Sequence, residues 1–124
     1  MSDEYRFTIL VEKNGIALDN MPIIQRYSVA EDATAEVVQA ADNNTTSFHA
    51  IPQLTMGTLG FFLLTTDQAL NVKFNLNTPV PFNANGLILF LGCALAQATP
   101  NQNIEVNNPA VSTAANLDIV GGGT

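Results

Sequence analysis

The sequence predicts an all-β fold, a two-sheet antiparallel sandwich of the jelly-roll type. Seven or eight short runs of apolar and β-branched residues alternate with turn signals rich in Asn, Pro and Gly, at intervals of about 8 to 12 residues. The chain of 124 residues is long enough to bury one hydrophobic core and too short for two independent ones. We therefore expect a single domain that spans residues 1–124.

The N-terminal quarter of the chain contains two predicted strands. The first covers residues 6–11 and ends at the turn signal Lys13-Asn14-Gly15; the second covers residues 25–29, where apolar and polar residues alternate. Residues 16–24 have no regular pattern, because polar turn residues and a proline interrupt them. Two interpretations of residues 1–24 stay open: an N-terminal arm that reaches a neighbouring subunit, or an ordinary first strand of the sandwich.

Residues 30–41 fit two kinds of secondary structure. Ala33, Val37 and Ala40 would lie on one face of a helix, and Glu31 would sit at the helix N-terminus, where negative charge is favourable. The same segment also fits a strand centred on Val37. Because the rest of the chain is rich in β patterns, the strand is the preferred prediction.

The middle of the chain contains its clearest strands. Residues 42–46 are a loop by composition, and residues 47–51 form a short strand that Pro52 stops. Residues 58–66 are a continuous apolar run of strand length, which indicates a strand covered on both faces. Residues 69–76 alternate between apolar and polar side chains, as in a strand with one face in the core.

Residues 78–81 contain two prolines, so they form an edge strand or a connection. Residues 87–91 form a second fully apolar run, which we expect to be a buried strand. The remaining predicted elements are a Pro/Asn loop (residues 98–103), a strand (104–106), a turn (107–109), the last strand (117–120) and a flexible glycine tail (121–124).

Charge and composition restrict the partners of the chain. The net charge is −7, and the four cations Arg6, Lys13, Arg26 and Lys73 are dispersed along the sequence, so we expect no binding to nucleic acid. Charged residues make up only 12% of the chain, against about a quarter in an average protein. A surface of amides and hydroxyls is less costly to bury than a charged one. This composition suits an assembly subunit, and it also suits a neutral exposed surface.

The sequence shows no membrane, disulfide or targeting signal. The N-terminus has no basic segment followed by an apolar one, so we expect folding in a cytosol. The longest apolar stretch, residues 87–98, is shorter than the roughly 20 residues that span a bilayer, so we expect no membrane contact. Cys93 is the only cysteine, which excludes an intramolecular disulfide.

The residues that most often carry chemistry are few. His49 is the only histidine, which excludes metal sites built from several histidines, and Ser47 two residues before it lacks the third group and the oxyanion hole of a hydrolase. Cys93 is expected to be an inert core thiol. Residues 42–44 offer oxygen ligands to Ca²⁺ but lack the spaced acids of an EF-hand. We predict no catalytic, cofactor-binding or metal-binding residue, and therefore no enzyme and no cofactor.

Four segments resemble small structural proteins of tailed bacteriophages. The shared pattern is a Thr-Asp-Gln strand pair, a central apolar strand, a Val-Asn-Asn-Pro turn and a last strand that ends in glycine. The segments are residues 63–75, 85–90, 104–109 and 114–120, and the resemblance covers about residues 58–123.

The resemblance implies a jelly-roll module of the virion, of the capsid decoration (cement) type. Such a protein would be made in the host cytoplasm, would bind the major capsid protein at the capsid surface and would form a homotrimer. Proteins of this type also occur in tails and fibres, which is the first alternative. From another class, a β-sandwich that binds carbohydrate would use exposed rings, for which Tyr5, Tyr27 and Phe48 are the candidates.

Overall fold

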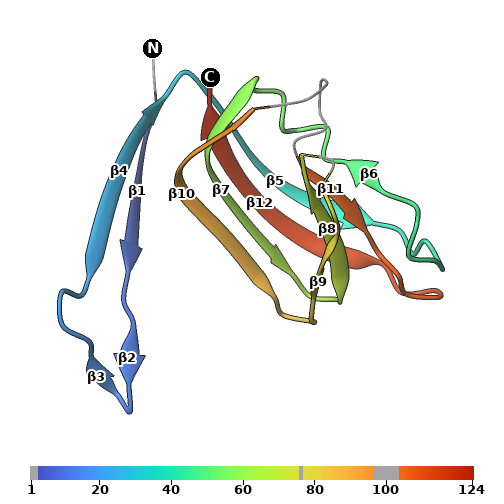
Figure 1. Cartoon of the computed structure of the whole chain (residues 1–124), viewed down its shortest axis with the longest axis horizontal. Coiled ribbons are helices and arrows are strands. Elements are labelled where there is room, and N and C mark those ends of the chain that lie inside the picture. The colour runs from blue at the N-terminus through green and yellow to red at the C-terminus, as the bar shows by residue number, and fades with distance from the viewer. Residues whose placement is uncertain (1–2, 76, 97–103) are drawn as a thin grey trace.

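The computed structural model describes residues 3–75, 77–96 and 104–124 and is all-β (Figure 1). The predicted loop at residues 98–103, the first two residues and Leu76 lie outside the described residues. The described residues form no helix, and therefore none that is long and apolar enough to cross a membrane.

Eight strands form two antiparallel sheets of four strands each. The sheet orders are β10-β7-β12-β5 and β6-β11-β8-β9. The first of the eight strands pairs with the last, the second with the next to last, and so on inward: β5–β12, β6–β11, β7–β10 and β8–β9, all antiparallel. This nested pairing is that of a jelly roll. The predicted sandwich of jelly-roll type is thus confirmed. The strand bounds are β5 Glu31–Gln39, β6 His49–Ala50, β7 Thr58–Thr66, β8 Leu70–Phe74, β9 Val80–Phe82, β10 Leu87–Ala96, β11 Ile104–Asn107 and β12 Ala115–Gly123.

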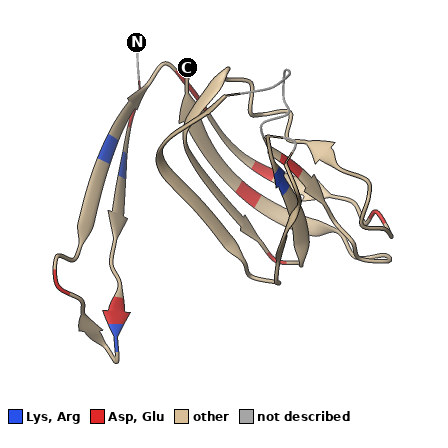
Figure 2. Cartoon of the chain, in the orientation of Figure 1, with Lys and Arg blue, Asp and Glu red and all other residues tan. Residues whose placement is uncertain are grey.

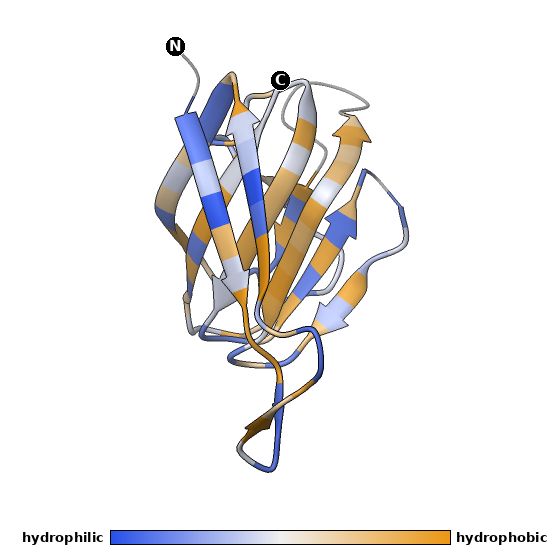
Figure 3. Ribbon diagram, turned by 90° about the vertical axis from the view of Figure 1, so that its left-hand side faces the viewer, coloured by the Kyte–Doolittle hydropathy of each residue, from blue (hydrophilic) through white to orange (hydrophobic). Residues whose placement is uncertain are grey.

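A separate two-stranded ribbon precedes the sandwich. It pairs β1 (Asp3–Ile9) with β4 (Ile23–Val29) over their whole lengths, from Asp3 opposite Val29 to Ile9 opposite Ile23. Beyond the ribbon, residues 10–22 form a tip that contains the short strands β2 (Glu12–Lys13) and β3 (Ile16–Ala17). Figures 1 and 3 show the tip projecting past the end of the sandwich.

The tip closes in the way that its sequence predicts. Lys13 pairs with Ile16, so Asn14 and Gly15 are the two residues of the hairpin loop. Both have positive φ, 54° and 79°, which two-residue hairpin loops require and which Asn and Gly adopt most readily. The strand prediction for residues 30–41 is also confirmed, because β5 covers most of that segment.

Cations are unevenly divided between the ribbon and the sandwich (Figure 2). Strand pairing places Arg6 of β1 opposite Arg26 of β4, and Lys13 lies in the tip, so three of the four cations of the chain belong to the first 29 residues. In the sandwich, Asp118 of β12 lies opposite Glu36 of β5. Two like charges are therefore cross-strand neighbours in each place.

The hydrophobic core lies between the two sheets. Phe62 and Leu64 point inward from β7, and Leu70 and Val72 point inward from β8. Phe61 is also fully buried, but on the opposite face of β7, beneath the ribbon. The prediction that residues 58–66 are covered on both faces is therefore confirmed at Phe61.

The prediction of a flexible tail at residues 121–124 is wrong for its three glycines. Gly121, Gly122 and Gly123 are the last residues of β12, are buried, and pair with β5 and β7. A Cβ at Gly122 would lie 2.5 Å from Phe61 Cζ, and one at Gly123 would lie 1.9 Å from the Thr58 carbonyl oxygen. Glycine is needed here because neighbouring atoms approach the backbone closely.

Two predictions about β10 are also wrong. Residues 87–91 are buried on one face only: Ile88 is 5% exposed and lies in the core, whereas Leu87 is 57% exposed. Cys93 is not a core residue but is half-buried where the β7–β10 register shifts, and its thiol donates to the Leu59 carbonyl oxygen at 3.3 Å. The run of apolar residues suggested burial on both faces, but only the face that carries Ile88 and Phe90 packs against the core between the sheets.

The first strand is likewise displaced from its prediction. β1 begins at Asp3 and ends at Ile9, whereas we expected residues 6–11, and the segment 16–24 contains β3 and the start of β4. β1 starts early because its first residues, which are polar, pair with β4. The local sequence pattern does not indicate this pairing.

Candidate functional site

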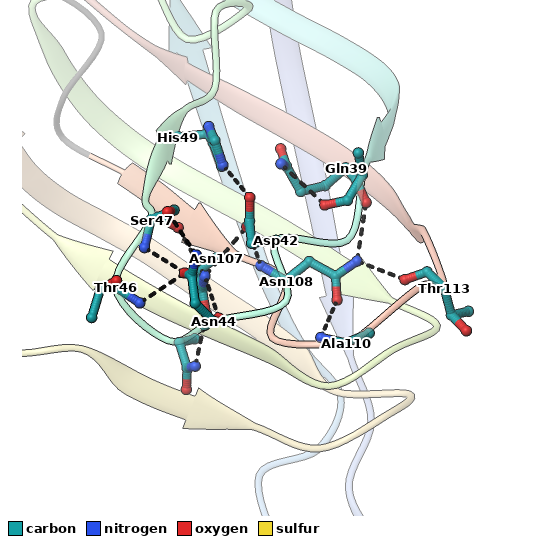
Figure 4. Close-up of polar contacts among 12 residues, drawn as sticks. Gln39, Asp42, Asn44, Thr46, Ser47, His49, Asn107, Asn108, Ala110 and Thr113 are labelled. Atoms are coloured by element: carbon teal, nitrogen blue, oxygen red, sulfur yellow. Dashed lines mark hydrogen bonds and ion pairs between the residues drawn. The ribbon is translucent and has the colours of Figure 1, made fainter.

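The polar residues singled out in the sequence meet in one cluster (Figure 4). Residues 42–49 and residues 107–113 form two loops that lie against each other, joined by a backbone hydrogen bond from the Asp42 amide to the Asn108 carbonyl oxygen at 2.8 Å. We call this the loop cluster. Its labelled members are Gln39, Asp42, Asn44, Thr46, Ser47, His49, Asn107, Asn108, Ala110 and Thr113.

Asp42 is the charged centre of the loop cluster. His49 Nε2 lies 2.6 Å from Asp42 Oδ1, and Asp42 Oδ2 accepts from the Asn108 amide at 3.0 Å and from Asn107 Nδ2 at 3.3 Å. Burial opposes the ionised form of Asp42, but the hydrogen bonds from His49, the Asn108 amide and Asn107 outweigh it, so the pKa of this carboxyl lies below its usual value. Asp42 is therefore the charged hydrogen-bond acceptor that holds the two loops together.

Asn107 and Asn108 are fully buried, and their side chains are hydrogen-bonded throughout. Asn107 Nδ2 donates to the carbonyl oxygens of Ser47 at 2.8 Å and Asn44 at 3.1 Å, and its Oδ1 accepts from Asn71 at 3.0 Å. Asn108 Nδ2 donates to the carbonyl oxygens of Thr113 and Gln39, and its Oδ1 accepts from the Ala110 amide. These bonds use the polar atoms to fix the loops, which is a structural role.

Sequence reasoning interpreted residues 107–109 only as a turn and did not identify this role. The sequence does contain a signal for this role: two consecutive amides follow the buried apolar residues Ile104 and Val106 of β11. Two buried amides at a strand end require several partners, and three of those partners lie 60 to 69 residues away in the sequence.

The hypothetical Ser47–His49 pair is not formed in the described structure. His49 pairs with Asp42, and Ser47 Oγ instead accepts a hydrogen bond from Asn44 Nδ2 at 3.1 Å. The side chain of His49 is 44% exposed. The geometry thus places a histidine beside a carboxylate, with the serine oxygen engaged elsewhere.

The Ca²⁺ possibility at residues 42–44 gains no support from the geometry. Asn44 Oδ1 accepts from the amides of Thr46 and Ser47, at 3.1 and 2.9 Å, which is an ordinary turn contact. Asp42 points to the other loop. Among residues 3–75, 77–96 and 104–124, no three metal-binding side chains come together.

The aromatic candidates for sugar stacking already contact other side chains. The rings of Tyr5 and Tyr27 lie 4.9 and 5.8 Å from that of Phe61, centroid to centroid. Lys73 Nζ lies 4.2 Å from the centroid of the Phe48 ring. All three rings are half-buried and pack against other side chains of the chain.

The ribbon is attached to the sandwich through aromatic rings and one hydrogen bond. Tyr5 and Phe7 of β1 and Tyr27 of β4 all pack on Phe61 of β7. The Tyr5 hydroxyl donates to the Asp32 carboxylate of β5. This bond, together with burial and the charges of Asp32 and Asp3, raises the pKa of Tyr5 to about 12.

Most of the exposed large hydrophobic residues of the described chain are on the ribbon and tip. Six of the ten exposed large hydrophobic residues belong to residues 10–24. Figure 3 shows hydrophobic residues on the projecting tip, away from the sandwich core. The six residues are Leu10, Val11, Ile16, Leu18, Ile23 and Ile24.

A second apolar surface lies on the side of the sheet β10-β7-β12-β5 that faces away from the core. We call this side the outer face; it carries Phe61, Leu63 and Thr65 of β7, which alternate with the inward residues. Next to the ribbon contact at Phe61, the outer face contains an open depression of about 340 Å³. Leu63 and Val120 line it together with Glu36 and Asp118.

Comparison of the chain with protein-family models, with curated proteins and with solved structures finds no match.

Proposed function

We propose that this protein is a non-enzymatic structural protein of a virus particle, which binds the capsid surface and stabilises it as a decoration protein. The observation that carries the proposal is the projecting ribbon and tip, where six large apolar side chains are exposed on a segment with no core of its own. Covering these apolar side chains with a partner surface is energetically favourable.

Three further observations support a binding role. The loop cluster, which holds the main chemistry-bearing residues, is occupied by hydrogen bonds that join loops. Charged residues make up only 12% of the chain, so little charge has to be desolvated when the surface is covered. The jelly roll agrees with the fold expected from the resemblance of residues 58–123 to small structural proteins of tailed bacteriophages.

In this function the partner is the major capsid protein, and the place of action is the surface of the virion after synthesis in the host cytoplasm. The protein would cover junctions between capsid subunits and add buried area where neighbouring subunits meet. Threefold junctions favour a homotrimer, because each copy then makes the same contacts.

Copy number in purified particles tests the proposal. Quantitative mass spectrometry of particles of the virus that encodes the chain should find this protein at a fixed, simple ratio to the major capsid protein. A few copies per particle would instead indicate a tail or fibre component. Absence from washed particles would refute the virion function altogether.

A further inference from the structure

We infer that the tip of one copy binds the outer face of a second copy, in the depression beside Leu63 and Val120, with Lys13 next to Glu36 and Asp118. The inference rests on the proposed assembly function and adds the contact by which copies associate. It follows from three properties of the described chain: an apolar tip, an apolar depression and matching charges.

The tip exposes four large apolar side chains. Ile16 is 74% exposed, Leu10 is 54% exposed, and Val11 and Leu18 are each 44% exposed. β2 and β3 contain two residues each, and an isolated two-stranded hairpin is marginally stable in water. Contact with a further apolar surface would stabilise both the hairpin and its exposed side chains.

The outer face offers that surface within every copy of the chain. Leu63 and Val120 are half-buried, and they border a depression of about 340 Å³ that the ribbon leaves open. The depression adjoins Phe61, where the outer face already binds β-structure, namely the rings of β1 and β4. A second ribbon segment would extend a type of packing that this face already uses.

Charge complements one face of the tip. Lys13 and its cross-strand partner Ile16 share this face, and strand alternation places Glu12 on the other face; Asp19 is the second acid of the tip. Glu36 and Asp118 are cross-strand partners beside the depression, and like charges directly opposite each other destabilise a sheet. In the described part of the chain, the one ion pair joins His49 and Asp42, so neither acid has a cation and Lys13 has no acid. Lys13 from another copy would neutralise this acidic pair.

The tip is held away from the depression of its own chain. The ribbon is attached at Tyr5 and Tyr27, and its ladder runs without interruption to Ile9 opposite Ile23. A strand rises about 3.3 Å per residue, so Lys13 lies about 25 Å along the ribbon from Tyr5. Since the surfaces that meet are different, each copy donates one tip and accepts another, and a ring closes when the rotation between copies allows it.

Light scattering of the purified protein over a dilution series tests the contact. The unchanged protein should have the mass of several chains at micromolar concentration and dissociate on dilution. Ile16→Ser should raise the dissociation constant by about tenfold or more, because it places a polar group in an apolar contact. Val111→Ser is the matched control, because Val111 is 76% exposed and lies outside the tip and the outer face.

Charge exchange gives a sharper test. Lys13→Glu should weaken association, and so should the double variant Glu36→Lys with Asp118→Lys. The double variant also brings the net charge of −7 nearer to zero. Repulsion from net charge alone predicts stronger association of the double variant. Combining all three substitutions in one chain restores opposite charges at the contact and should recover most of the affinity.

A shortened chain separates folding from association. Residues 10–22 can be replaced by Asn-Gly, because Ile9 and Ile23 are direct partners that a two-residue loop joins. This variant should keep the circular dichroism and unfolding midpoint of the sandwich and be monomeric. An associated tip-less variant, or an unchanged protein that is monomeric at all concentrations, would overturn the inference. Particle copy number tests the virion function separately, so either proposal fails without the other.

Discussion

Phe61 lies directly over Gly122. The two residues are cross-strand partners in β7 and β12, and the ring of Phe61 occupies the space where a side chain at Gly122 would be. Tyr5, Phe7 and Tyr27 of the ribbon pack on the same ring. The missing side chain of one glycine therefore decides where the ribbon attaches to the sandwich.

Gly122→Ala should destabilise the protein and loosen the ribbon. The new Cβ would lie 2.5 Å from Phe61 Cζ and 3.2 Å from Val29 Cγ1, so the ring has to move. We expect a loss of about 1–3 kcal/mol, as for overpacking in other cores, measured by urea unfolding. Gly57→Ala is the control, because its Cβ would meet only the Thr124 carbonyl oxygen at 3.7 Å. Equal effects of the two substitutions would contradict this explanation.

Tyr5 should titrate at unusually high pH. In a Tyr27→Phe background, Tyr5 is the remaining tyrosine, and its absorbance change in alkaline solution should have a midpoint near 12. Adding Asp32→Asn should lower this pKa toward 10.0, since it removes the negative acceptor. An unchanged midpoint in the Asp32 variant would contradict the assignment.

The same shift predicts how the ribbon responds to alkali. The folded pKa of Tyr5 is above its unfolded value, so the stabilisation is complete below the unfolded pKa and is lost as pH rises through about 12. Wild-type protein should therefore lose stability over this range more steeply than the Tyr5→Phe variant, which has no titrating phenol. Stability measured by urea unfolding at each pH checks this.

Asn107→Ala should be costly although it removes no apolar packing. The substitution leaves the carbonyl oxygens of Ser47 and Asn44 and the amide of Asn71 without their Asn107 partner. Losing satisfied buried hydrogen bonds costs about 1–3 kcal/mol, to be measured by urea unfolding. Asn83→Ala, at an exposed residue whose side chain makes no hydrogen bond to the described residues, should change stability little.

Asp42 should contribute to the loss of stability in acid. Its folded pKa lies below the usual value, so its contribution is present above the unfolded pKa and disappears as pH falls through the folded one. The stability of Asp42→Asn should consequently fall less between about pH 5 and pH 2 than that of the wild type.

Two further variants define the acid response. Asp19→Asn is the matched control, because it makes the same chemical change at an exposed acid that has no ion pair with the described residues. Asp67→Asn should also flatten the profile, because side-chain and backbone hydrogen bonds from Asn116 lower the pKa of Asp67. An Asp42→Asn profile as steep as that of Asp19→Asn would show that Asp42 is not a source of acid sensitivity.

The sequence by itself determined the features that depend on neighbouring residues. Alternation in residues 69–76 and the apolar run at 58–66 identified β8 and β7, and Asn14-Gly15 identified the hairpin loop of the tip. Regular turn spacing identified the jelly-roll sandwich. These patterns work because strand faces alternate every residue and because few residues adopt positive φ.

Only the tertiary structure decided the features that depend on distant residues. Gly121–Gly123 have the local freedom of a flexible tail, yet close approach by Phe61 and Thr58 makes them part of a buried strand. Asp42 accepts hydrogen bonds from Asn107 and Asn108, which are 65 and 66 residues away. Leu87 is exposed because it lies on the face of β10 opposite the core residue Ile88. Hydrophobicity and turn propensity are local properties, whereas burial and hydrogen-bond partners depend on which strands become neighbours in space.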